Sequence, residues 1–297
     1  MTAPVLISAT EAGAMGRIAD AAVGWLLSHG QPVFQQINGV ILMLAGLTEH
    51  LLELPSAWLL AALLAGLGLW RVSAGFALFT LVGLNLVVSM QLWEPMIGTL
   101  ALVLTSALLA LLIGLPVGVL AARQRWIWAV TRPLLDLMQT MPAFVYLIPA
   151  VMLFSTGAVP AVLATVIFSM PPVVRLTVLG LEQVPKDLLE AGRSFGCSEG
   201  QLLMKVQWPN AQPTVMTGVN QTLMLALSMV VIASMIGGGG LGDVVLRGIQ
   251  QLNIGLGFEG GLAVVILAVI LDRLSQSLSH PPSRPLSTRL RQLWGHP

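Results

Sequence analysis

This sequence has unusually few charged residues. Only 9% of its 297 residues are Asp, Glu, Lys or Arg, whereas about 25% is usual in a soluble domain. Hydrophobic residues make up 56% of the chain. Fourteen basic and thirteen acidic side chains cannot solvate the surface of a globule of this length. These proportions exclude a water-soluble domain and a disordered chain, and they indicate an integral membrane protein.

Other absences narrow the function. The single cysteine, Cys197, excludes an internal disulfide, and the four histidines are too far apart in sequence to suggest a metal site. A net charge of +1 provides no basic field for nucleic acid. The N-terminus lacks the basic region and apolar core of a cleaved signal peptide. Neither lysine, Lys186 or Lys205, lies in a GxxxxGK[ST] loop, so we expect no ATP site in this chain.

Charge-free intervals indicate where the chain crosses the bilayer, because a spanning helix needs about 20 mostly apolar residues. We predict an all-α polytopic membrane protein with seven spans. The spans are 54–70, 72–93, 95–122, two within 137–174 that turn at Gly157 and Pro160, 214–236 and 258–271. The apolar segment 37–48 is shorter than a span, and it forms either an amphipathic helix along the membrane surface or an eighth span.

Basic residues give the orientation, because cytoplasmic loops are enriched in Lys and Arg. With the C-terminus inside, twelve of the fourteen basic residues fall on the cytoplasmic side, and only Arg17 and Arg247 fall outside. The predicted regions are an extracytoplasmic N-terminal tail (1–53), two accessory helices (54–93), the core (94–277) and a basic cytoplasmic tail (278–297) held near anionic lipid.

The densest charge cluster lies in the predicted cytoplasmic loop 182–213. Apolar residues at helical spacing, interrupted by Gly196 and Gly200, predict two short amphipathic helices joined by a glycine turn. Pro185 and Pro209 are expected to bound the two helices. An apolar face on such a loop needs something to cover it, so we expect a partner protein here.

A motif in this loop carries a family resemblance. Glu190-Ala191-Gly192 is followed after three residues by Gly196 and after nine more by Val206-Gln207-Trp208-Pro209. This spacing resembles the EAA loop of ABC importer permeases, written EAA-x3-G-x9-I-x-L-P, with departures at Gly192, Val206 and Trp208. The segments 138–154, 171–176, 220–250 and 255–273 are similar to the glycine betaine/proline betaine importer permeases, a branch that also includes choline and carnitine importers.

The resemblance implies a type I (MetI-like) permease in a bacterial inner membrane, and a transport subunit rather than an enzyme. It implies a second permease copy, two cytoplasmic ATPase subunits that bind ATP and Mg, and a separate extracytoplasmic binding protein. The residues implied to contact the ATPase are Glu190, Ala191, Gly192, Gly196, Val206 and Pro209. Glu190 is expected at a helix start, where a carboxylate favours the helix dipole. Choline or carnitine as the specific solute is the alternative within this class.

The translocation path is predicted from polar and soft side chains within the spans, although helix packing and core filling explain such residues equally well. The candidates are Gln139, Thr140, Tyr146, Asn220, Gln221, Ser228, Met229, Ser234 and Met235. The run Gly237, Gly238, Gly239 and Gly240 is expected to form either a mobile outer gate or a tight turn. The rival class, an ion-coupled transporter, would place ionisable residues mid-membrane, and this chain has almost none there.

Overall fold

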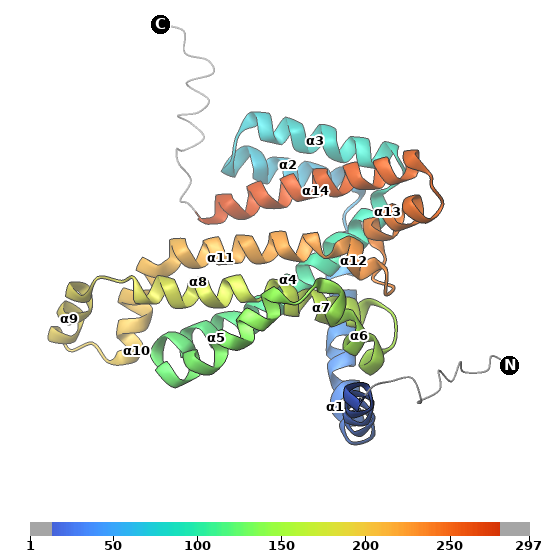
Figure 1. Ribbon diagram of the computed structural model, residues 1–297. Coiled ribbons are helices and arrows are strands. Elements are labelled where there is room, and N and C mark those ends of the chain that lie inside the picture. Colours follow the sequence, from blue (N-terminus) through green and yellow to red (C-terminus); the bar gives the residue numbers. More distant parts are fainter. Residues whose placement is uncertain (1–13, 280–297) are drawn as a thin grey trace, which may run out of the picture.

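A computed structural model describes residues 14–279, and every regular element in that range is helical (Figure 1). The predicted tail at 278–297 lies almost wholly outside the described residues. The helices are α1 (Ala14–Glu53), α2 (Ala57–Arg71), α3 (Ala74–Ser89), α4 (Trp93–Arg123), α5 (Arg125–Thr140), α6 (Ala143–Phe154), α7 (Ala158–Ser169), α8 (Pro171–Glu182), α9 (Lys186–Ser194), α10 (Glu199–Leu202), the π-helical turn η1 (Leu203–Gln207), α11 (Trp208–Ser228), α12 (Val230–Ser234), α13 (Gly240–Gln250) and α14 (Ile254–Ser279).

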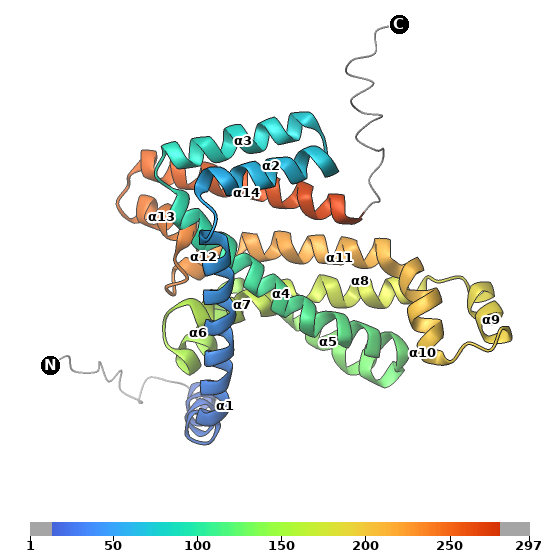
Figure 2. The same cartoon turned by 180° about the vertical axis from the view of Figure 1, so that it is seen from behind.

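The core of the molecule is a bundle of α4, α8 and α11, in which α8 and α11 run side by side (Figures 1 and 2). Gly114 and Gly118 lie four residues apart on α4 and allow α8 to approach closely. A Cβ at Gly114 would lie 2.6 Å from a methyl carbon of Val173, and one at Gly118 would lie 2.7 Å from the Cβ of Thr177. Small residues at this spacing are a common way for membrane helices to pack.

A second layer, made of α2, α3 and α14, lies along one side of this bundle (Figure 1). Gly83 of α3 packs against Ile266 of α14, where a Cβ would come within 2.8 Å of a side-chain carbon. Asn220 of α11 joins the two layers: its amide donates to Asp272 Oδ1 at 3.3 Å, and its Oδ1 accepts a hydrogen bond from the Ser275 hydroxyl. The C-terminal end of α14 lies towards the same end of the molecule as α9 and α10 (Figure 1).

The N-terminal helix α1 is much longer than the predicted segment 37–48. It crosses the bundle on the side opposite α2 and α3 (Figure 2), and its part from Ser28 to Glu53 makes an angle of 92° with α2. Ile41 is buried among residues of α4 and α7. The hydroxyls of Thr48 and Thr105 lie 2.7 Å apart. The bundle therefore contacts α1 in a transverse position through the part of the helix around Ile41 and Thr48.

Among the described residues, three helices are long and apolar enough to cross a membrane: α4, Ala158–Glu182 and Ile254–Ser277. The count rises to five if each of two bent pairs is one span, α1 with α2 and α5 with α6, the latter bent by 102°. The number seven therefore stays a prediction. The expected turn near Gly157 is confirmed, since Gly157 has φ 143° and separates α6 from α7. Pro160 instead lies inside α7.

One span begins earlier than its charge-free interval suggested. The helix expected from residue 137 begins at Arg125 as α5 and continues through Arg132 and Asp136 before it breaks at Met141. Asp136 pairs there with Arg175 of α8. Both side chains of this pair are more than a third exposed, so α5 carries its charges on the surface of the bundle.

Candidate coupling loop and translocation path

The loop after α8 is built around a glycine turn, as the sequence predicted. Helix α9 ends at Ser194, and Gly196 has φ 79°, a conformation that glycine adopts without steric cost. The amide of Cys197 donates to the Gly192 carbonyl at 3.1 Å, and the amide of Gly196 donates to the Arg193 carbonyl at 2.9 Å. These two bonds form a Schellman motif, which satisfies the last carbonyls of α9.

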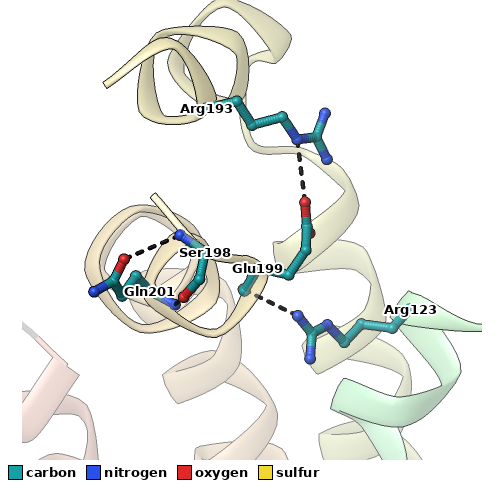
Figure 3. A network of polar contacts seen from close by, with 5 residues as sticks. All are labelled: Arg123, Arg193, Ser198, Glu199 and Gln201. Atoms are coloured by element: carbon teal, nitrogen blue, oxygen red, sulfur yellow. Dashed lines mark hydrogen bonds and ion pairs between the residues drawn. The ribbon is translucent and has the colours of Figure 1, made fainter. Parts of the chain in front are cut away.

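A capping box starts the second half of the loop (Figure 3). The Ser198 hydroxyl accepts from the Gln201 amide at 3.4 Å, and Gln201 Oε1 accepts from the Ser198 amide at 3.0 Å. Arg193 and Glu199 form an ion pair at 3.2 Å across the turn. Arg123, at the end of α4, donates to the Glu199 carbonyl at 3.0 Å and so ties the loop to the core.

Three local predictions are wrong. Glu190 is the fifth residue of α9 rather than its start, so the helix dipole does not explain it; Asp187 occupies the first turn. Gly200 does not break a helix but lies within α10. Pro209 does not end the second helix, because α10, η1 and α11 follow one another without interruption. Pro209 is the second residue of α11, directly after the π-helical turn η1.

The motif residues divide into half-buried and exposed sets. Gly192 faces Leu202, which is buried, and a Cβ at Gly192 would lie 2.6 Å from a Leu202 methyl carbon. This contact accounts for glycine where the family pattern has alanine. Val206 is half-buried, whereas Glu190 and Ala191 are exposed.

Apolar side chains on the loop are left uncovered. Phe195 is 89% exposed, Met204 65% and Leu188 42%. We call these three residues the coupling surface. No residue of α9 is fully buried, and the described part of the chain covers this helix only partly, where Gly192 meets Leu202. An exposed apolar surface beside a rigid turn indicates a docking site for another protein.

The structure separates the predicted path residues into two groups. Tyr146 and Met229 are buried in one hydrophobic cluster, and the Tyr146 hydroxyl donates to the Met138 carbonyl at the α5–α6 break. Ser234 is buried and Asn220 bonds to α14. The exposed group consists of Gln139, Thr140, Gln221, Ser228 and Met235.

The glycine run Gly237–Gly240 forms a tight turn between α12 and α13. Gly237, Gly239 and Gly240 have φ between 70° and 90°. A Cβ at Gly240 would lie 2.4 Å from Thr99 Oγ1, and Thr99 Oγ1 also accepts from the Leu241 amide at 2.7 Å. The carbonyl of Ile236 accepts from the Gly157 amide at 2.8 Å. The turn is thereby fastened to α4 and to the start of α7.

An open surface cavity of about 330 Å³ lies between α5 and α8, and its charged lining residues Arg132, Asp136 and Glu182 are exposed. Its lining residues are Trp128, Arg132, Asp136, Arg175, Val178, Leu179 and Glu182. The charges were read from the sequence as lying beyond the spans, so this cavity was missed. The spacing of Trp128, Arg132 and Asp136, every fourth residue on one helix face, is the signal that could have found it. Among residues 14–279 no group of three or more His, Cys, Asp or Glu side chains could hold a metal ion.

A helical membrane bundle whose polar loop carries the EAA spacing and an uncovered apolar surface defines the permease subunit of an ABC importer. The family model described as "Binding-protein-dependent transport system inner membrane component" matches residues 114–280. The fold resembles the permease of the MetNI methionine ABC transporter, with a TM-score of 0.55 and 23% identity over 63% of this chain and 94% of that one.

Curated relatives narrow the group. The chain is 52% identical to the glycine betaine/proline betaine permease ProW of Escherichia coli, over 86% of this chain and 72% of the relative. It is 47% identical to the glycine betaine permease OpuAB of Bacillus subtilis, over 88% and 93%. It is 46% identical to the glycine betaine/carnitine permease GbuB of Listeria monocytogenes, over 85% and 91%. The chain belongs to the binding-protein-dependent inner-membrane permeases, in the group that contains these glycine betaine permeases. It is a transport subunit, and its family implies an ATPase partner and a substrate-binding protein.

Proposed function

We propose that this chain forms the translocation path of an ATP-driven importer for glycine betaine, proline betaine and similar quaternary amines. The proposal extends to this chain the solutes named for relatives at 46–53% identity. Carnitine in one of those names supports the quaternary-amine class over a single solute. ATP and Mg are bound by the partner ATPase in this proposal.

The observation that carries the proposal is the coupling surface on the EAA loop. The Schellman motif and capping box fix the shape of the loop, and Arg123 ties it to α4, while Phe195 and Met204 stay uncovered. In our proposal this surface docks into the ATPase, and Glu190, exposed on the same helix, pairs with a basic residue there.

The assembly proposed is two permease copies, two ATPase subunits and one extracytoplasmic binding protein. Exposed polar residues within the spans, namely Gln139, Thr140, Gln221 and Ser228, are then free to face the second copy and line the path. The loop lies in the cytoplasm, with the C-terminus on the same side and the N-terminus outside. The transverse position of α1 and its angle of 92° with α2 support a helix along the membrane surface rather than an eighth span.

Uptake of radiolabelled glycine betaine into proteoliposomes that contain the permease, its ATPase and the binding protein tests the proposal. We expect uptake to require ATP and the binding protein. The variant Glu190→Lys should lower uptake about tenfold or more, because a reversed charge repels its basic partner.

Glu53→Lys, the same change at the end of α1, is the matched control and should leave uptake unaltered. Uptake without ATP would overturn the transport mechanism. Equal uptake by Glu190→Lys and Glu53→Lys would overturn the role of the loop.

A further inference from the structure

The cavity between α5 and α8 combines features that one helix alone could not supply. From α5 it receives an indole, a guanidinium and a carboxylate, at Trp128, Arg132 and Asp136. From α8 it receives a second guanidinium and a second carboxylate, at Arg175 and Glu182. Two helix faces therefore converge on one volume of about 330 Å³, at the small end of the range for ligand pockets.

The formal charges of the cavity cancel, but they are not all used in pairing. Arg175 pairs with Asp136 through one Nη2 atom. Arg132 and Glu182 form no ion pair with any residue between 14 and 279. The Nε of Arg175 is buried and has no hydrogen-bond partner in the same range.

These groups fit a small zwitterion. A guanidinium binds a carboxylate through parallel N–H donors, and the exposed guanidinium of Arg132, which forms no ion pair with residues 14–279, can supply them. A quaternary ammonium group has no N–H to donate, and it is bound by aromatic faces and nearby negative charge. Trp128 supplies the aromatic face, and Glu182 supplies the negative charge.

We propose that the α5–α8 cavity is a binding site for a zwitterionic solute that carries a quaternary ammonium and a carboxylate. This inference rests on the proposed function, because it takes the transported solute as the ligand. Glu182 is the last residue of α8, directly before the coupling loop. The site therefore lies at the loop end of the core, where a solute leaving the path would pass last.

Equilibrium dialysis of radiolabelled glycine betaine against the permease–ATPase complex, without the binding protein, tests the site. The complex is held in nanodiscs of phosphatidylethanolamine and phosphatidylglycerol, so that no choline head group competes. We expect saturable binding that falls about tenfold in Trp128→Ala and in Arg132→Gln. Neither residue takes part in the Arg175–Asp136 pair. Trp128 also packs against the cluster of Leu135, Met138, Val173 and Val174, so the unfolding temperature of Trp128→Ala is measured beside its binding. Arg132→Gln leaves that cluster intact and tests the site independently.

Trp126→Ala and Arg125→Gln are the matched controls, because both residues are exposed on α5 and neither lines the cavity. They should bind betaine as the unaltered complex does. A second arm uses choline, which lacks the carboxylate: Arg132→Gln should lose the preference for betaine over choline, whereas Trp128→Ala should weaken both. If the cavity binds only lipid head groups, no saturable binding of glycine betaine will be seen, and that result would overturn the proposal. Equal betaine binding by Trp128→Ala and Trp126→Ala would also overturn it. ATP-dependent uptake by the unaltered assembly reports separately on the proposed function.

Discussion

The coupling loop and the glycine run at 237–240 sit at opposite ends of the core and use glycine differently. Gly196 in the loop and Gly240 in the run have similar positive φ values, 79° and 71°. A Cβ at Gly196 would meet nothing within 4 Å, whereas one at Gly240 would lie 2.4 Å from Thr99 Oγ1. The loop needs glycine for its backbone shape alone, and the run needs it also for its contacts.

This difference suits the two regions to different roles: the loop exposes side chains to a partner, whereas the glycine run fixes helices to one another. The loop is held to α4 by the bond from Arg123 to the Glu199 carbonyl and by a hydrophobic cluster that includes Leu203, and it leaves Phe195 exposed. The glycine run is bonded to α4 and packed against the start of α7. Those contacts favour the tight turn over the mobile gate, the two alternatives that its sequence left open.

The largest effect expected is on stability, at the glycine run. Gly240→Val should lower the free energy of unfolding by about 3 kcal/mol or more, because backbone strain at positive φ and overpacking against Thr99 both contribute. Gly196→Val is the matched variant, with strain but no clash, and should cost clearly less. Thermal unfolding of the purified permease measures both, and equal losses would erase the distinction between the two regions.

A smaller effect is expected at the coupling surface. Phe195→Asp should weaken binding of the ATPase about tenfold, because a central apolar anchor of an interface contributes more than about 1 kcal/mol. The unfolding temperature should not change, since Phe195 is 89% exposed. Leu252→Asp, at an 87% exposed leucine between α13 and α14, should bind normally. Surface plasmon resonance measures the affinity of each variant for the ATPase. Unchanged affinity in Phe195→Asp would rule out the coupling surface as the ATPase docking site.

The smallest effect is expected inside the loop. Ser198→Ala removes the hydroxyl of the capping box and should cost about 1 kcal/mol of local stability. Faster hydrogen exchange at the amides of residues 199–203 is the measurement. Ser194→Ala, at the end of α9, is the control and should leave those amides unchanged. If Ser198→Ala also leaves them unchanged, the loop is not held by its own caps.

Residue spacing and glycine positions were sufficient to predict the helix–turn–helix form of the coupling loop. Gly196 was placed in the turn because the motif spacing left apolar residues on both sides of it, and its positive φ agrees. The hairpin at Gly157 was found in the same way. The position of Glu190 was missed because helix α9 starts directly after Pro185, four residues earlier than the motif suggests.

Contacts between helices far apart in the chain could not be predicted from the sequence. Taking each charge as the end of a span did not show that helix α5 begins at Arg125, nor that Asp136 and Arg175 pair with each other across α5 and α8. Single-sequence hydropathy contains no information about such partners. The transverse packing of α1 was likewise hidden, because it depends on contacts of Ile41 and Thr48 with distant helices.

The bend between α10 and α11 has a mechanical consequence. The helical stretch from Glu199 to Ser228 is continuous in sequence, but α10 lies across the direction of α11, so the chain turns at the π-helical segment Leu203–Gln207 (Figures 1 and 2). A partner that pushed on the coupling surface would therefore act on α11 through this bend. The wider winding of the π turn makes it the place where the angle between α10 and α11 can change.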